Sequence, residues 1–166
     1  MVPRIKKILI ATDGSEKVKN AVHWGIRLAR ENGASVTALY VLTPTGFHHS
    51  MRGDMWVKEY FNYLREEGKK AIDYVVDIGL HEEVKVDAII IKDKKPVDAI
   101  IDFATENDID LIVMGTQGKT GVERVLLGSV AENVARYAKK PVLVIPSSKI
   151  KEAAPIKETP FNAAGF

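Results

Sequence analysis

A chain of 166 residues is long enough for one domain with a single core. Its 24 Lys and Arg residues nearly balance its 22 Asp and Glu residues, so the net charge of +2 gives no general attraction to nucleic acid or membranes. The absence of cysteine excludes disulfides, thiolate metal sites and a thiol nucleophile. No apolar run has the length of a membrane span and no signal-peptide core is evident, so we expect a cytoplasmic protein.

The first half of the chain predicts two strands and two helices. Residues 6–12 form an apolar run that stops at a polar turn, as a buried strand does. Ser15 is a natural N-cap for a helix whose apolar residues keep helical spacing up to Asn32-Gly33. Residues 35–42 predict a second strand. After an irregular polar loop, a long helix carries an apolar stripe between Val57 and Val75.

Three histidines in this half are candidates for catalysis or metal binding. His23 lies on the first predicted helix without a partner at ligand spacing, and we interpret it as a surface residue. His48 and His49 lie on the polar loop, where no third ligand follows at a recognisable spacing. We interpret both as solvated, and we expect no metal site built from protein residues alone.

The second half repeats the alternation of strands and helices. Residues 84–91 predict a third strand, and Pro96 is well placed as the first residue of the next helix. Residues 109–114 predict a fourth strand, and residues 141–146 predict a fifth between two prolines. We expect one domain over residues 1–147 and a C-terminal tail over residues 148–166, which has no clear apolar period.

The stretch between the fourth and fifth strands is rich in glycine. Gly115, Gly118 and Gly121 are three residues apart, and Gly128-Ser129 opens a segment with helical spacing. A glycine loop before a helix N-terminus presents backbone N–H groups and the positive end of the helix dipole, which suits a phosphate. Ordinary turn and cap roles stay open for the same residues. The spacing lacks the patterns of a P-loop and of a dinucleotide-binding fold.

The order of these elements predicts the fold class. Five short apolar strands that alternate with four amphipathic helices indicate right-handed βαβ units and an open, doubly wound α/β fold with a parallel sheet. Ligands of such sheets bind beyond the carboxyl ends of the strands, where the strand order reverses. If the fourth strand lies beside the first, Thr12 and Asp13 meet residues 115–118 at this crevice.

The glycine spacing resembles that of a known family. Gly115-Thr116-Gln117-Gly118, nine further residues and Gly128-Ser129 match the G-x-x-G-x9-G-Ser/Thr pattern in the ATP-binding branch of the universal stress protein family. The flanking segments KKILIATDGS, DLIVMG, LLGSVAENV and KKPVLVIP are also similar, so the resemblance covers residues 4–147. It implies an adenine nucleotide α-hydrolase-like fold with strand order 3-2-1-4-5, and ATP as the ligand, with or without Mg²⁺.

The resemblance also implies roles for individual residues. Asp13 would lie near the adenine or ribose, and Val41 would offer backbone contacts to the base. The expected nucleotide-binding residues are Thr12, Asp13, Val41, Met114, Gly115, Gln117, Gly118, Gly128, Ser129 and Val130. Lys119 and Arg124 lie in the nine-residue linker, where contact with the γ-phosphate and simple solvation both stay open.

Two positions depart from the pattern of the family. Many nucleotide-binding members have a small residue shortly before the proline that opens the third helix, whereas this chain has Lys94-Lys95-Pro96. A lysine at position 94 could reach a phosphate or crowd the ribose. Gln117 replaces a frequent His or Arg.

Three functions fit these observations. The first is an ATP-binding stress-response protein that acts as a nucleotide-dependent dimeric switch. The second is a slow ATPase or another nucleotide-processing enzyme, and the third is an interaction module without nucleotide. Asp13, with Glu123 as a distant second, is the plausible carboxylate near the crevice, which favours binding over turnover, so we expect no catalytic residue. The intact glycine pattern argues against the third function. The resemblance further implies an unidentified protein partner and a homodimer that pairs through the fifth strand, at Val142, Leu143, Val144 and Ile145.

Overall fold

A computed structural model describes residues 4–44, 54–92, 94–118 and 127–147. The strands are β1 (Lys7–Ala11), β2 (Ser35–Leu42), β3 (Val86–Lys92), β4 (Leu111–Gly115) and β5 (Val142–Ile145). The helices are the short 3-10 helix η1 (Glu16–Val18) and the α-helices α1 (Lys19–Asn32), α2 (Asp54–His81), α3 (Pro96–Glu106) and α4 (Ser129–Tyr137). None of these helices is long and apolar enough to cross a membrane.

The strands form one parallel sheet in the order β3-β2-β1-β4-β5, which confirms the predicted fold class and strand order. The third strand begins at Val86 rather than at the predicted residue 84. Val84 instead belongs to the turn that ends α2, because its N–H group donates to the carbonyl of Gly79 at 2.8 Å. Glu83 in the same turn has a positive φ of 56°.

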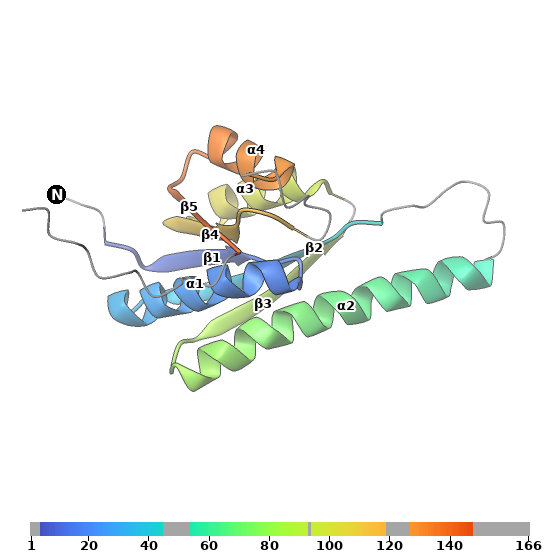
Figure 1. Ribbon diagram of the computed structural model, residues 1–166, viewed down its shortest axis with the longest axis horizontal. Helices are drawn as coiled ribbons and strands as arrows, with labels where there is room; N and C mark the ends of the chain where they lie inside the picture. The colour runs from blue at the N-terminus through green and yellow to red at the C-terminus, as the bar shows by residue number, and fades with distance from the viewer. Residues whose placement is uncertain (1–3, 45–53, 93, 119–126, 148–166) are drawn as a thin grey trace, which may run out of the picture.

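Two helical layers enclose the sheet. Helices α1 and α2 cover one face, and α3 and α4 cover the other (Figure 1). Successive residues of β1 alternate between the two cores: Ile8 and Ile10 pack under α1 and α2, whereas Leu9 packs on the opposite side. All three are fully buried. The central strands are therefore apolar on both faces, as expected for a covered parallel sheet.

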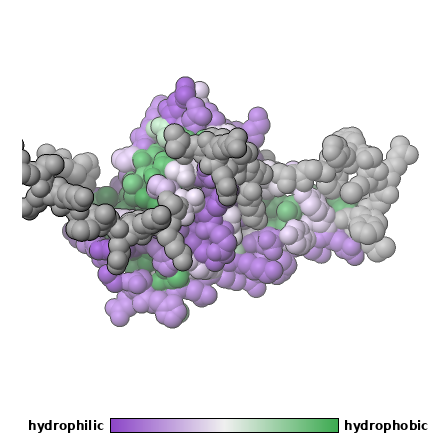
Figure 2. Space-filling view, in the orientation of Figure 1, coloured by the Kyte–Doolittle hydropathy of each residue, from purple (hydrophilic) through white to green (hydrophobic). Residues whose placement is uncertain are grey.

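The two edge strands are less protected. Along β3 only part of each side chain is covered, and Ile90 is 37% exposed. Along β5 three of the four apolar side chains are half-buried, and only Ile145 is buried. The surface seen in Figure 2 is otherwise mostly hydrophilic, with small separate apolar areas.

Helix α2 is longer than the sheet that it covers. At about 1.5 Å per residue its 28 residues span about 42 Å, whereas the 8 residues of β2 span about 26 Å. Ala71, Ile72 and Val75 in its second half are buried against the sheet. Its first half extends past the carboxyl ends of the strands (Figure 1), and Tyr63 there is 60% exposed.

The carboxylate of Asp110 links β1 to β4 at the amino ends of these strands. Oδ2 of Asp110 accepts hydrogen bonds from the backbone N–H groups of Lys6 and Lys7, at 2.8 and 2.9 Å. The bond from Lys6 is the main cause that lowers the pKa of Asp110 below its usual value. The negative charge thus satisfies two backbone donors just before the two central strands begin.

Candidate functional site

The turn after β1 forms one wall of the candidate site. The N–H group of Thr12 donates to the carbonyl of Leu39 at 3.0 Å, which holds the start of the turn against β2. Its buried hydroxyl oxygen accepts a bond from the N–H group of Gly14 at 3.1 Å. Oδ1 of Asp13 accepts two bonds from Ser15, one from the N–H group at 3.0 Å and one from the hydroxyl at 2.7 Å. The side chains of the turn itself therefore fix its shape.

Ser15 differs from the sequence-based expectation. It occupies the N-cap position of η1 with extended backbone angles, φ −74° and ψ 158°, but its side chain makes no cap hydrogen bond. The hydroxyl donates to the carboxylate of Asp13, and a hydrogen bond to a charged acceptor is a strong one. Ser15 is thus a positioning residue for Asp13. The Asp-x-Ser spacing, typical of an Asx-turn, is the sequence signal that could have revealed this role.

The glycine loop after β4 forms the opposite wall. A Cβ atom at Gly115 would lie 3.6 Å from the carbonyl oxygen of Lys17 and 3.6 Å from Cα of Val18, so the end of β4 packs closely on η1. The N–H group of Thr116 donates to the carbonyl of Ile145 at 3.0 Å. The N–H group of Gly128 donates back to the carbonyl of Thr116 at 2.6 Å. The start of α4 is therefore held beside the end of β4.

The two walls meet at Asp13 and Gly118. A Cβ atom at Gly118 would lie only 2.7 Å from Oδ2 of Asp13, closer than a side chain can approach without displacing the carboxylate. Strands β1 and β4 pair directly, from Ile8 with Leu111 to Ile10 with Val113. The predicted meeting of the Asp13 turn with residues 115–118 is therefore confirmed, and Gly118 is required for the closeness of the approach.

Other predicted residues lie around this contact with different exposures. Val41 is half-buried near the carboxyl end of β2, two residues beyond the partner of Thr12. The side chain of Met114 is 5% exposed and packs in the core under α3 and α4, so only its backbone borders the loop. Val130 packs against the same core. Gln117 is half-buried within the glycine loop.

The first turn of α4 also differs in detail from the expectation. Gly128 is the N-cap residue and Ser129 is the first helical residue, so the N-cap role considered for Ser129 is wrong. Ser129 is exposed, and its carbonyl accepts a bond from the side chain of Asn133 at 2.8 Å. The first N–H groups of a helix lack partners within the helix. A Cβ atom at Gly128 would lie 3.1 Å from the carbonyl oxygen of Thr116, so glycine allows the start of α4 to lie close to the loop.

Of the three basic residues considered as phosphate ligands, the structure describes Lys94. The ammonium group of Lys94 lies 3.1 Å from Oδ2 of Asp102, so the side chain turns toward α3. This hydrogen bond is the main cause that raises the pKa of Lys94. Lys119 and Arg124 lie outside the described residues.

The histidines were considered as metal ligands. His23 is exposed, as predicted, and its Nε2 lies 3.0 Å from the hydroxyl of Tyr74 on α2. His48 and His49 lie outside the described residues. Within the described ranges, no group of three or more His, Cys, Asp or Glu side chains could hold a metal ion.

A sequence match identifies the family of the chain. The sequence pattern of the universal stress protein family matches residues 4–146, and the chain therefore belongs to that family. Among its relatives is the universal stress protein MJ0531 of Methanocaldococcus jannaschii, which is 40% identical over 144 residues. This match covers 87% of the chain and 84% of the relative.

Solved structures of the family are similar in fold. The universal stress protein UspA from Lactobacillus plantarum has a TM-score of 0.73 and 26% identity, with 87% of this chain and 99% of that chain covered. A universal stress protein in complex with cAMP has a TM-score of 0.67 and 25% identity, with 88% of this chain and 100% of that chain covered.

Proposed function

We propose that this protein binds an adenine nucleotide, ATP in the first place, between the Asp13 turn and the glycine loop, and acts as a nucleotide-dependent regulatory switch. The close approach of Gly118 to Asp13 carries this proposal, because it brings a carboxylate to a loop that exposes backbone rather than side chains. The structure of a related protein in complex with cAMP supports an adenine nucleotide as the class of ligand.

Each part of the crevice suits one part of the ligand. The backbone N–H groups of Gly118 and of the first turn of α4 would surround the phosphates, with the exposed hydroxyl of Ser129 as a further donor. The carboxylate of Asp13 would accept hydrogen bonds from the ribose or the base, and the backbone of Val41 would contact the base. Mg²⁺ would accompany ATP and neutralise phosphate charge beside the carboxylate.

Binding fits the described residues better than turnover does. Hydrolysis of ATP requires a positioned base and a carboxylate that holds the metal ion. Oδ1 of Asp13 accepts two bonds from Ser15, which fixes the carboxylate as a rigid acceptor. We therefore propose a protein whose occupied and empty states are read by a partner.

The fifth strand suits a homodimer. β5 is an edge strand with apolar, half-buried side chains, so its free edge could pair with a second copy across a two-fold axis. Native mass spectrometry at micromolar protein should show a dimer. A monomer at all working concentrations would contradict this part of the proposal.

Titration calorimetry with Mg-ATP tests the nucleotide site. We expect a Kd in the micromolar range for the natural sequence and no measurable binding for Gly118→Val, because the new side chain would occupy the space beside Oδ2 of Asp13. Thr105→Val on the exposed surface of α3 is the matched control and should bind as the natural sequence does. Absence of binding to the natural sequence, together with no nucleotide released on denaturation, would overturn the proposal.

A further inference from the structure

The wall that contains Asp13 is also packed directly on helix α2. Asp13 contacts the position of Gly118 across the crevice, and the next residue, Gly14, contacts α2. A Cβ atom at Gly14 would lie 2.8 Å from Cβ of Ala71. Gly14 has a φ of +74°, so it adopts a left-handed turn that brings the backbone against the helix. Two consecutive residues therefore join the candidate site to the middle of α2.

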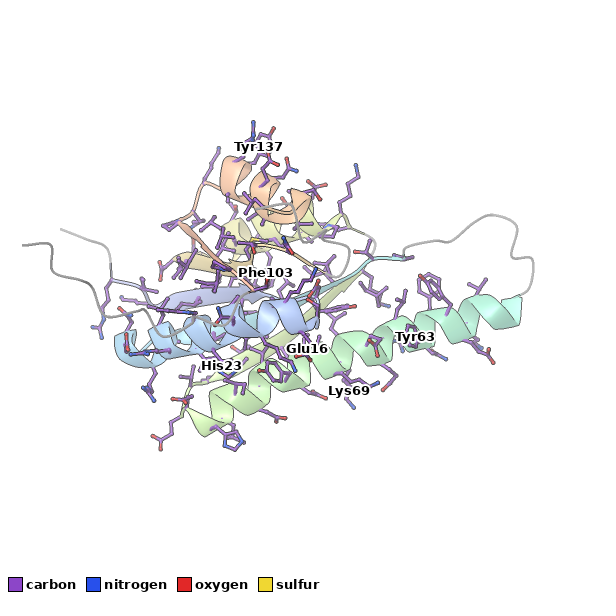
Figure 3. All side chains as sticks on the ribbon, in the orientation of Figure 1. Glu16, His23, Tyr63, Lys69, Phe103 and Tyr137 are labelled. Carbon is purple, nitrogen blue, oxygen red and sulfur yellow. The ribbon has the colours of Figure 1, made fainter. Side chains whose placement is uncertain are left out.

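A second set of contacts joins the same segment to α2 one turn further along. The carboxylate of Glu16 on η1 lies 2.5 Å from the ammonium group of Lys19, and that group lies 5.1 Å from the centre of the Tyr74 ring. The hydroxyl of Tyr74 is hydrogen-bonded to Nε2 of His23 at 3.0 Å. Glu16 on η1 and His23 on α1 both lie on the side that faces α2 (Figure 3).

We propose that occupancy of the candidate site is coupled to helix α2 around Ala71 and Tyr74, where the Asp13 turn and the start of α1 contact the helix. This inference rests on the proposed nucleotide function and deepens it by naming the element that reports the ligand. Ala71 is buried and Tyr74 packs against the same core one turn further along, so both contacts act on the half of α2 that lies on the sheet.

The route from ligand to helix follows from these contacts. A nucleotide bound beside Gly118 and Asp13 fixes the carboxylate of Asp13 through its hydrogen bonds to the ribose or the base. Because the bonds from Ser15 and Thr12 close the turn, the turn responds as one unit rather than by a side-chain rotation. A change in the turn therefore alters the contact of Gly14 with Ala71. It also alters the contact of Lys19, which is paired with Glu16 on η1, with the ring of Tyr74. Coupling of this kind is reciprocal, so changes on α2 must alter nucleotide affinity.

Hydrogen–deuterium exchange of the full chain, with and without saturating Mg-ATP, tests the coupling. We expect ATP to slow amide exchange at least about threefold both in the Asp13 turn and in α2 around residues 60–75. In Tyr74→Phe, which removes the bond to His23, and in Ala71→Gly, which removes the contact with Gly14, slowing should persist in the turn and decrease in α2. The Kd for ATP should change at least about threefold in the same variants.

Two control variants isolate the contacts from general effects on the helix. Tyr63→Phe removes the hydroxyl of an exposed tyrosine on α2 and should leave ATP-dependent slowing intact. Lys69→Gly introduces a glycine at an exposed position of the same helix in place of a good helix former, and so loses a similar amount of helix propensity to Ala71→Gly. It should retain ATP-dependent slowing in α2.

The outcomes separate the two proposals. Slowing in the turn without any change in α2 of the natural sequence would overturn the coupling and leave nucleotide binding in place. Equal effects of Ala71→Gly and Lys69→Gly would also overturn it, because helix propensity would then explain both. Unchanged exchange in every segment would overturn the nucleotide function, and the coupling with it.

Discussion

The two ends of the central strands β1 and β4 each carry a carboxylate, but the carboxylates are bonded differently. At the amino ends, Asp110 accepts two backbone N–H groups from the segment that leads into β1, so it joins the two strands. At the carboxyl ends, Asp13 accepts its bonds through Oδ1 from Ser15 within its own turn, while Oδ2 faces Gly118. The hydrogen bonds at the amino end thus link two strands, whereas those at the carboxyl end stay within one turn. A ligand can therefore enter at the carboxyl end without breaking the contact that holds the amino end.

The largest effect that tests this comparison is expected from Gly14→Ala. Alanine disfavours the φ of +74°, and its Cβ atom would lie 2.8 Å from that of Ala71. We expect a loss of about 3 kcal/mol in the free energy of unfolding, measured by urea denaturation.

The double variant Gly14→Ala, Ala71→Gly separates the two causes. It should recover the stability lost through the steric contact with α2, but not the stability lost through the unfavourable φ of alanine at position 14. If the free energy of unfolding of Gly14→Ala lay within about 0.5 kcal/mol of that of the natural sequence, the turn would not be rigid.

A smaller effect, confined to the amino end, is expected from Asp110→Ala. Removing an exposed acceptor of two backbone bonds should lower the free energy of unfolding by about 1 kcal/mol after screening by solvent. The Kd for Mg-ATP should stay within about twofold, because the substitution lies at the opposite end of the strands. A large loss of affinity would mean that the two ends are not independent.

The same carboxylate predicts a pH dependence. Hydrogen bonds from Lys6 and Lys7 lower the pKa of Asp110 in the folded state. Its contribution to stability is therefore complete above the pKa in the unfolded chain, about 4, and is lost as the pH falls through the lower pKa of the folded state. Urea denaturation between neutral and acidic pH should show a smaller acid-dependent loss in Asp110→Asn than in the natural sequence. Asp77→Asn, an exposed control on α2, should retain the full dependence.

At the carboxyl end, Ser15→Ala should affect ligand binding more than folding. Loss of the hydroxyl that donates to Asp13 should cost about 0.5 to 1 kcal/mol in stability, because the backbone bond from residue 15 to Asp13 remains. The Kd for Mg-ATP should rise about fivefold, because the carboxylate loses one of its two positioning bonds. Calorimetry and denaturation on the same preparation measure both quantities, and an unchanged Kd would remove the positioning role.

The smallest effect is expected from Lys94→Met. The ammonium group of Lys94 pairs with Asp102 on α3, so its removal should change the Kd for Mg-ATP by less than about twofold. Calorimetry would contradict this placement if the affinity fell about tenfold, since that loss would indicate a contact between the lysine and a phosphate.

Much of the fold follows from the sequence because its signals are local. Apolar runs that end at Gly, Pro or Asp marked all five strands, and Gly33 ends α1 with a φ of 63°, as the Asn-Gly pair predicted. The strand order came from the resemblance to the family rather than from periodicity. The bridge formed by Asp110 was not predicted, because it joins residues more than 100 positions apart and leaves no local pattern.

The candidate site was predictable in its location and less so in its contacts. Strand order and glycine spacing were sufficient to bring Asp13 beside Gly118. The partner of Lys94 was not predictable, because its long side chain can reach several acceptors, whereas the partner of Ser15 could have been inferred from the Asp-x-Ser spacing. In both cases a nearby carboxylate was the preferred partner, as expected when a charged acceptor competes with neutral ones.

The outer edge of β3 bears on how the chain avoids aggregation. Residues 88–91, AIII, form a run with high β-propensity on an edge strand that pairs on one side only, with β2. Such runs recruit strands from other molecules unless charge interrupts them. Asp87 and Lys92 stand at the two ends of the run, so a further strand added there would have to bury or align these charges. The sequence of β5, VLVI, contains no charge of this kind, and the two edges of the sheet therefore differ in the strand pairing that they permit.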